Sequence, residues 1–245
     1  MRTAIKISPT MLESWRLAKD GVYENSMQQL IEKLQKKFEP NEAISRGTAF
    51  HELIENGTNK YLKQIERIVG SGKNKQRESV TVARVYEKSM SLWWEFGEQP
   101  VSVVDEYRKS HPLLSHETWE NITIPVGRYE VTILMKIDGL EGLSIREAKT
   151  TGRAKNYNDY LNSMQWKVYL YALDDAIEVV YDVFVLNEKN DKCAYSEFVY
   201  KRPDNIKEVV MNELRSFISW LEVSENIELV KSETWDKWNQ KSEAI

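Results

Sequence analysis

Two acidic residues and a lysine stand near the middle of the chain, in the segments Ile137-Asp138-Gly139 and Ile145-Arg146-Glu147-Ala148-Lys149. Alternate residues of a strand share a face, so Glu147 and Lys149 would point the same way and Ala148 the opposite way. If the two segments pair as neighbouring strands, Asp138 ends one strand beside Glu147 on the next. Two carboxylates held close repel each other unless a proton or cation lies between them, and oxygen ligands suit Mg²⁺ or Mn²⁺. With the lysine beside a metal-bound water or a phosphate, this set favours phosphodiester hydrolysis.

The same spacing also suits a solvent-facing hairpin with alternating charges, because 29% of the residues in this chain are charged. The run from Val131 to Ile137 is too apolar for a peripheral ribbon, however, which argues for a central strand. Charges at the end of a central strand are costly to bury, so they are usually functional or paired.

The elements that would position these residues change in type along the chain. The N-terminal third predicts helices that begin near Ser8-Pro9-Thr10 and cover 26–38, 42 toward 65, and 79–96, with a loop at 70–75. From about Val101 the period becomes two, which predicts strands at 101–107, 117–126, 129–137 and 143–149. A helix is expected over 157–176, a hairpin over 177–186 and 194–200, and a last helix from Pro203 through Leu221.

This order predicts an α/β fold with a mixed central sheet flanked by helices and a helical N-terminal region. We expect a single domain over residues 1–245. Residues 1–96 would be mostly helical, 97–200 would hold the sheet and the helix after it, and 201–245 would be a C-terminal helical region.

Composition narrows the classes of function. The net charge of −4 excludes wrapping of nucleic acid by a wholly basic chain but leaves room for a local basic groove. No apolar run approaches the ~20 residues of a membrane span, and the first residues lack a signal-type stretch, so we expect a cytoplasmic protein without membrane contact. The single cysteine, Cys193, excludes an internal disulfide and an all-cysteine iron–sulfur cluster.

Two further pieces flank the acidic segments. Arg46-Gly47-Thr48-Ala49-Phe50-His51 lies before the predicted sheet, and Gln165-Trp166-Lys167-Val168-Tyr169 lies after it. With these pieces the chain resembles the RecB-type branch of the PD-(D/E)XK nuclease superfamily, which is related to CRISPR-associated exonucleases. The signature of that family is an Arg-Gly-x-x-x-His helix, then Asp and Glu-x-Lys on a hairpin, then Gln-x-x-x-Tyr on the next helix. The resemblance covers residues from about 7 to about 200 and implies a restriction-endonuclease-like fold.

The resemblance also implies roles for the matched residues. His51, Asp138, Glu147 and the backbone carbonyl of Ala148 would hold the metal, and Lys149 would orient or activate the attacking water. Gln165 would position the lysine or the nucleic-acid strand, and Tyr169, one turn later, would support the site or touch the substrate. Each helix residue also has an ordinary structural explanation, since His51 is surrounded by apolar residues and Tyr169 would also suit a packed helix face.

The chain departs from many members of this family, which carry an iron–sulfur cluster on four cysteines. We therefore expect a cluster-free member, acting alone in a bacterium or its phage. Its work would lie in recombination, repair or phage DNA processing, with a recombination or replication protein as a possible partner.

Basic residues suggest where DNA would lie. Six cations and one acidic residue occupy positions 60–77, and two more cations directly follow the Glu-x-Lys segment. Basic side chains supply the salt-dependent phosphate contacts of DNA binding, although a solvated helix end would also explain the first group. The candidate DNA-binding residues are Arg46, Lys60, Lys73, Lys75, Arg153 and Lys155.

The sequence as a whole predicts a Mg²⁺- or Mn²⁺-dependent deoxyribonuclease, and the family resemblance favours an exonuclease acting on single-stranded DNA or DNA ends. Two alternatives stay open. One is a non-catalytic nucleic-acid-binding accessory module of recombination, and the other is a structure-specific endonuclease that cuts flaps or junctions.

Overall fold

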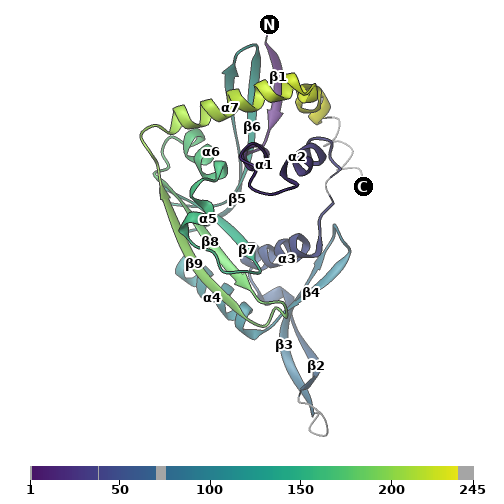
Figure 1. Ribbon diagram of the computed structural model, residues 1–245. Coiled ribbons are helices and arrows are strands. Elements are labelled where there is room, and N and C mark those ends of the chain that lie inside the picture. Colours follow the sequence, from purple (N-terminus) through teal and green to yellow (C-terminus); the bar gives the residue numbers. More distant parts are fainter. Residues whose placement is uncertain (1, 38, 70–75, 237–245) are drawn as a thin grey trace.

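The computed structural model describes residues 2–37, 39–69 and 76–236, and it confirms the expected α/β class with a mixed central sheet (Figure 1). The strands of this six-stranded sheet are β1 (Thr3–Ile7), β5 (Ser115–Val126), β6 (Tyr129–Glu141), β7 (Ser144–Thr151), β8 (Glu178–Leu186) and β9 (Cys193–Lys201). A smaller sheet contains β2 (Leu62–Val69), β3 (Gln76–Glu87) and β4 (Leu92–Phe96). The helices are α1 (Pro9–Lys19), α2 (Ser26–Leu34), α3 (Glu42–Asn56), α4 (Glu98–Ser110), α5 (Tyr157–Leu161), α6 (Met164–Ala172) and α7 (Ile206–Val223), with short 3-10 turns at Asn59–Tyr61 and Asn226–Val230.

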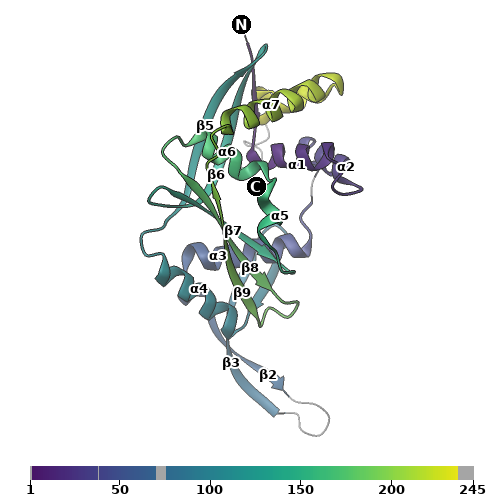
Figure 2. The ribbon, with the colours of Figure 1, turned by 60° about the vertical axis from the view of Figure 1, so that its left-hand side comes forward.

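Helices cover both faces of the central sheet (Figure 2). One hydrophobic cluster packs α1, α6 and α7 against the sheet and includes Trp15, Trp166 and Phe217. The second cluster lies between the sheet and α3, α4 and β3, and it includes Phe50 and Phe184. The strands β2 and β3 extend from this second side as an arm (Figures 1 and 2).

The central sheet has a break along one edge of β6. On that edge β1 pairs with β6 over residues 129–133, and β7 pairs only with residues 139–141. Residues 134–138 of β6 therefore have no strand partner there, whereas the opposite edge pairs with β5 along most of its length. Because β7 continues away from β6 while pairing with β8 on its other side, the two strands form a fork. Asp138 of β6 and Glu147 of β7 both lie next to the point where these two strands part.

Two helices that reach the fork have well-defined starts. The side chain of Asn41 accepts a hydrogen bond from Ile44 N at the start of α3, and Gly57, with φ 78°, follows its last residue. Ser163 caps α6 by accepting a hydrogen bond from Gln165 N. These caps fix where the His51 and Gln165 helices begin.

The structure corrects several expected elements. The helix expected toward residue 65 ends at Asn56, and residues 62–69, 76–87 and 92–96 are strands, so the expectation that residues 1–96 are mostly helical is wrong in its second half. Residues 101–107, expected as a strand, lie in α4, and β1 joins the central sheet at a position where we expected no strand. The helix expected over 157–176 is two helices, α5 and α6.

The burial pattern gives the physical reason for two of these corrections. Along β3 the side chains of Ala83, Val85 and Glu87 are buried in alternation, which is the period of a strand. Along α4 the buried residues are Pro100, Val104 and Tyr107, which lie on one face of a helix. Among the described helices, none is long and apolar enough to cross a membrane.

Candidate metal centre and active site

Asp138, Glu147 and Lys149 meet where β6 and β7 part. The carboxylate of Asp138 accepts a hydrogen bond from the backbone N–H of Ala148 at 3.0 Å. Lys149 Nζ lies 2.8 Å from Glu147 Oε1, and Glu147 is only 4% exposed. The two strands therefore bring Asp138 close to Glu147 and Lys149, which come nine and eleven positions later in the sequence.

His51 reaches the same point from α3. Its Nε2 lies 3.3 Å from Asp138 Oδ2 and 3.3 Å from the carbonyl oxygen of Ala148. Its Nδ1 lies 3.2 Å from Glu55 Oε1, one helical turn further on. Burial lowers the pKa of His51, but the hydrogen bonds to Asp138 and Glu55 outweigh burial and raise that pKa to about 10.

Gln165 and Tyr169 complete the site from α6. Gln165 Nε2 donates to Glu147 Oε1 at 2.7 Å, and Gln165 Oε1 accepts from Lys149 Nζ at 2.8 Å. The hydroxyl of Tyr169 donates to the backbone carbonyl of Lys136 at 3.0 Å and accepts from Gln165 Nε2 at 2.9 Å. Tyr169 thus satisfies a carbonyl in the unpaired part of β6, and Gln165 holds Glu147 and Lys149 together.

The pKa values of Lys149, Glu147 and Asp138 are shifted by different causes. Burial lowers the pKa of Lys149, but the Glu147 carboxylate outweighs burial and holds that pKa above its ordinary value. Burial, with a smaller contribution from Asp138, raises the pKa of Glu147 despite the nearby lysine. For Asp138, burial acts to raise the pKa, yet hydrogen bonding and charge attraction from His51 leave it below its ordinary value.

These residues fit a divalent cation. The second oxygen of Glu147, Oε2, is buried and has no hydrogen-bond partner among the described residues. An unsatisfied carboxylate oxygen in such a place is costly, and a cation would satisfy it. Among the described residues, the histidine and acidic side chains whose ligand atoms lie within 4.8 Å of one another are His51, Glu55 and Asp138, a group that does not include Glu147. The donors are carboxylate and carbonyl oxygens with one imidazole, a set suited to Mg²⁺ or Mn²⁺.

Glu55 is a site residue that the sequence analysis missed. It shares a face of α3 with His51 because the two are four residues apart. A ligating histidine commonly donates its other ring N–H to a carboxylate, which orients the ring. The His-x-x-x-Glu spacing was the available signal, but it is common on helices of charged proteins.

Gly139, directly after Asp138, has to be small. A Cβ at this position would lie 2.5 Å from Leu114 Cδ1 and 3.1 Å from the carbonyl oxygen of Ser115 on the neighbouring chain segment. A side chain here would displace one of these groups, so the Asp-Gly pair allows β5 to approach β6 beside the site.

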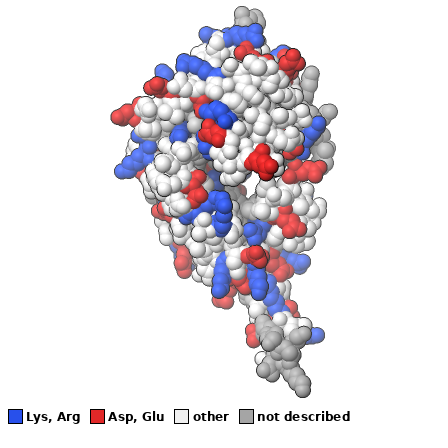
Figure 3. Space-filling model, in the orientation of Figure 1, with Lys and Arg blue, Asp and Glu red and all other residues white. Residues whose placement is uncertain are grey.

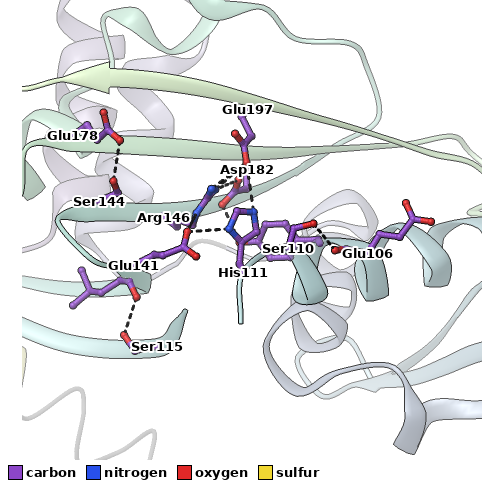
Figure 4. Close-up of polar contacts among 12 residues, drawn as sticks. Glu106, Ser110, His111, Ser115, Glu141, Ser144, Arg146, Glu178, Asp182 and Glu197 are labelled. Carbon is purple, nitrogen blue, oxygen red and sulfur yellow. Dashed lines mark hydrogen bonds and ion pairs between the residues drawn. The ribbon is translucent and has the colours of Figure 1, made fainter. Parts of the chain in front are cut away.

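A second polar cluster surrounds Arg146 of β7 (Figure 4). Because Arg146 precedes Glu147 on this strand, its side chain points to the opposite face. Arg146 Nη1 donates to Asp182 Oδ1 at 2.7 Å, and its Nε donates to Glu141 Oε2 at 2.9 Å. Asp182 is fully buried and also accepts hydrogen bonds from the hydroxyls of Tyr107 and Tyr195. This cluster joins β6, β7, β8 and β9 at the base of the fork.

The candidate DNA-binding residues are scattered. Arg153 is exposed just after β7, and Lys155, near the start of α5, has its Nζ 3.8 Å from Asp159. Arg46 lies beside the end of β7 and donates to the carbonyl of Asn187 at 3.4 Å, whereas Lys60 is exposed beyond the end of α3 and lies 3.8 Å from Glu52. Lys73 and Lys75 lie outside the described residues. Of this group, Lys155 lines the same cleft as Lys149.

Comparisons with known proteins add little. The sequence matches no protein-family model, and no curated protein matches it. One solved structure, titled "Crystal structure of SSO0001", matches with 15% sequence identity and a TM-score of 0.37. The match covers 49% of this chain and 55% of that one, so the chain spans about half the length of that structure. A likeness of this degree carries no argument about function.

Proposed function

We propose that this protein is a Mg²⁺- or Mn²⁺-dependent DNA nuclease that hydrolyses phosphodiester bonds. The observation that carries the proposal is the buried Oε2 of Glu147, which has no hydrogen-bond partner in the part of the chain that the structure describes, next to a residue set that already contains Asp138, His51 and Lys149. A structural ion pair has no need of a second carboxylate oxygen left without a partner.

In this proposal His51 Nε2, Asp138, Glu147 and the Ala148 carbonyl hold the metal. A divalent cation bound there supplies charge neutralisation at the phosphate and a water of lowered pKa. Lys149 Nζ lies 2.8 Å from Glu147 Oε1, so its positive charge would attract and orient the phosphate and the attacking water beside the metal.

Gln165 and Tyr169 act as positioning residues. Gln165 bonds to both Glu147 and Lys149, which fixes the ammonium relative to the carboxylate. Tyr169 ties Gln165 to the backbone of β6, so the helix and the two strands hold one geometry. Such preorganised charges are the largest contribution to catalysis in many enzymes.

The test is digestion of end-labelled single-stranded and double-stranded DNA with Mg²⁺, with Mn²⁺ or with EDTA, followed by sizing of the products. We expect cleavage with either metal, none with EDTA, and none by the Glu147→Gln variant. Absence of cleavage by the folded wild-type protein with both metals would contradict the proposal and favour a binding module.

Circular and linear single strands of the same sequence test the proposed preference for ends. An exonuclease leaves the circle intact and shortens the linear strand progressively. Cleavage of the circle would instead show endonuclease activity.

A further inference from the structure

A cleft of about 410 Å³ opens beside the site, between α1 with the loop that follows it and α5. Lys149 and Gln165 line this cleft, so it continues directly from the proposed active site. Its volume lies at the small end of the range for ligand pockets, roughly 300–1,000 Å³. Figure 3 shows the hollow near the middle of this face, with Lys and Arg side chains gathered below it.

The charged groups of the cleft suit a phosphate. Lys149 and Lys155 bring ammonium groups to the lining. Arg16 is a third cation of the lining, against the two carboxylates Glu13 and Asp159. Arg16 pairs with Glu13 and Lys155 Nζ lies 3.8 Å from Asp159, whereas Glu147, the partner of Lys149, lies outside the lining residues. The lining therefore carries one more positive charge than its own carboxylates balance.

Aromatic rings stand on both sides of the cleft. Tyr23, in the loop between α1 and α2, is 54% exposed although its ring is large and mostly apolar. Tyr160 of α5 packs on Tyr181 with ring centroids 4.8 Å apart and lines the other side. Aromatic side chains beside cations are the usual means of binding unpaired bases without reading their sequence.

We infer that this cleft binds the nucleotide next to the cleaved phosphate of a single DNA strand. Tyr23 stacks on the base, and Lys155 contacts the phosphate. The inference rests on the proposed nuclease function and adds to it the position and the single-stranded form of the substrate. A base stacked on Tyr23 must be free of the duplex, and a cleft of this volume has room for a nucleotide rather than for a double helix.

The test is binding of a fluorescein-labelled oligothymidylate, followed by anisotropy in EDTA so that nothing is cleaved. Tyr23→Ala should weaken binding by about 5- to 150-fold, since a base stack contributes roughly 1–3 kcal/mol. Its salt dependence should stay that of the wild type, and Tyr23→Trp should bind at least as tightly as the wild type. Lys155→Ala should reduce the slope of log affinity against log salt by about 0.7.

Trp93→Ala is the matched control, because Trp93 is 57% exposed but lies on β4 in the smaller sheet, outside the cleft lining. This variant should bind like the wild type. Loss of binding in Trp93→Ala, with Tyr23→Ala unchanged, would overturn the inference and place the strand on the β2–β4 sheet. No binding of the oligothymidylate by the wild type would overturn it as well.

The inference about the cleft and the proposed nuclease function can be contradicted independently of each other. If Tyr23→Ala loses binding but no metal supports cleavage, the cleft stands and the nuclease proposal falls. If the wild type cleaves DNA while Tyr23→Ala and Lys155→Ala bind it normally, the nuclease proposal stands and the cleft is wrong.

Discussion

Lys149 and Asp138 lie in one small site, but their removal has different physical consequences. Asp138→Asn removes a negative metal ligand, so Mn²⁺ affinity should fall together with cleavage. Lys149→Ala leaves the ligands in place and removes a cation, so Mn²⁺ should bind at least as tightly while hydrolysis slows by about 10²–10⁴. Calorimetry of Mn²⁺ binding with single-turnover cleavage measures both effects. Cleavage by Lys149→Ala at the wild-type rate would mean that the site is assigned wrongly.

In the proposed metal site, Glu55 would act on the metal through His51, because its Oε1 lies 3.2 Å from His51 Nδ1. Glu55→Ala should lower Mn²⁺ affinity by roughly 10- to 100-fold, because the His51 ring loses the partner of its Nδ1 and is less well oriented. Glu55→Gln, which can still accept a hydrogen bond, should recover part of this loss. Glu52→Ala is the control on the same helix, since the Glu52 side chain accepts a hydrogen bond from Tyr61 instead of from the His51 ring. Equal affinity in Glu55→Ala and the wild type would remove Glu55 from the site.

The family resemblance in the sequence predicted which residues would share one site. The fold brings His51, Asp138, Glu147, Lys149, Gln165 and Tyr169 together, although their catalytic roles are still predictions. Glu55 could not be found in the same way, because its relation to the site depends on which face of α3 turns toward β7. A helical period alone does not give that direction.

At the scale of elements, the Arg146 cluster joins four strands. Arg146→Ala leaves Asp182 buried without its cation, so unfolding in urea should cost about 3–5 kcal/mol less than for the wild type. The double variant Arg146→Met with Asp182→Leu should recover part of this loss, since it removes both charges. Arg128→Ala is the control, because Arg128 is largely exposed and pairs with Glu222 at the surface. Equal urea midpoints for Arg146→Ala and the wild type would contradict the prediction.

Glu87, at the end of β3, accepts a hydrogen bond from Ser45 of α3, and its contribution to the free energy of unfolding depends on pH. Burial acts to raise its pKa, but hydrogen bonds from Ser45, Ser89 and Met90 outweigh burial and hold that pKa below the ordinary value. A depressed pKa adds stability above the unfolded value of about 4.3, and this stability is lost as the pH falls through the folded value.

Glu87→Gln should therefore lower the free energy of unfolding by about 1 kcal/mol at neutral pH. The difference from the wild type should shrink below about pH 4. Urea denaturation at a series of pH values measures this difference, with Glu78→Gln on the exposed part of the same strand as the control. A difference that stays constant down to pH 3 would show that the charge of Glu87 contributes nothing.

Two of the elements that sequence reasoning misplaced, α4 and β3, illustrate why local patterns were not enough. Val101, Val103 and Val104 are β-branched and predicted a strand, but burial of Pro100, Val104 and Tyr107 against the second cluster selects a helix. The strand β3 was taken for a helix because its apolar residues also fit a loose helical spacing. In both cases tertiary packing decides between two local choices of similar free energy. The strands predicted at 117–126, 129–137 and 143–149 correspond to β5, β6 and β7, because their alternation or apolar length is unambiguous.

At the scale of the molecule, both hydrophobic clusters share the central sheet, so they should unfold together. Trp15 and Trp166 report on the first cluster, and Trp94 packs against the second. Urea transitions followed by tryptophan fluorescence and by far-ultraviolet circular dichroism should coincide, as expected for a single domain. Two separate transitions would contradict the single-domain interpretation and assign the β2–β4 region to a unit of its own.

At the fork between β6 and β7, the hydrogen exchange of one backbone amide, that of Ala148, depends on a side chain. The N–H of Ala148 faces the side where β7 has left β6, and its acceptor is the carboxylate of Asp138 rather than a strand carbonyl. Its exchange with deuterated solvent is therefore governed by a side chain, whereas the amides that pair β7 with β8 are governed by opening of the sheet. The rate of deuterium uptake at the Ala148 amide thus reports whether Asp138 is in place beside β7. This measurement needs neither metal nor DNA.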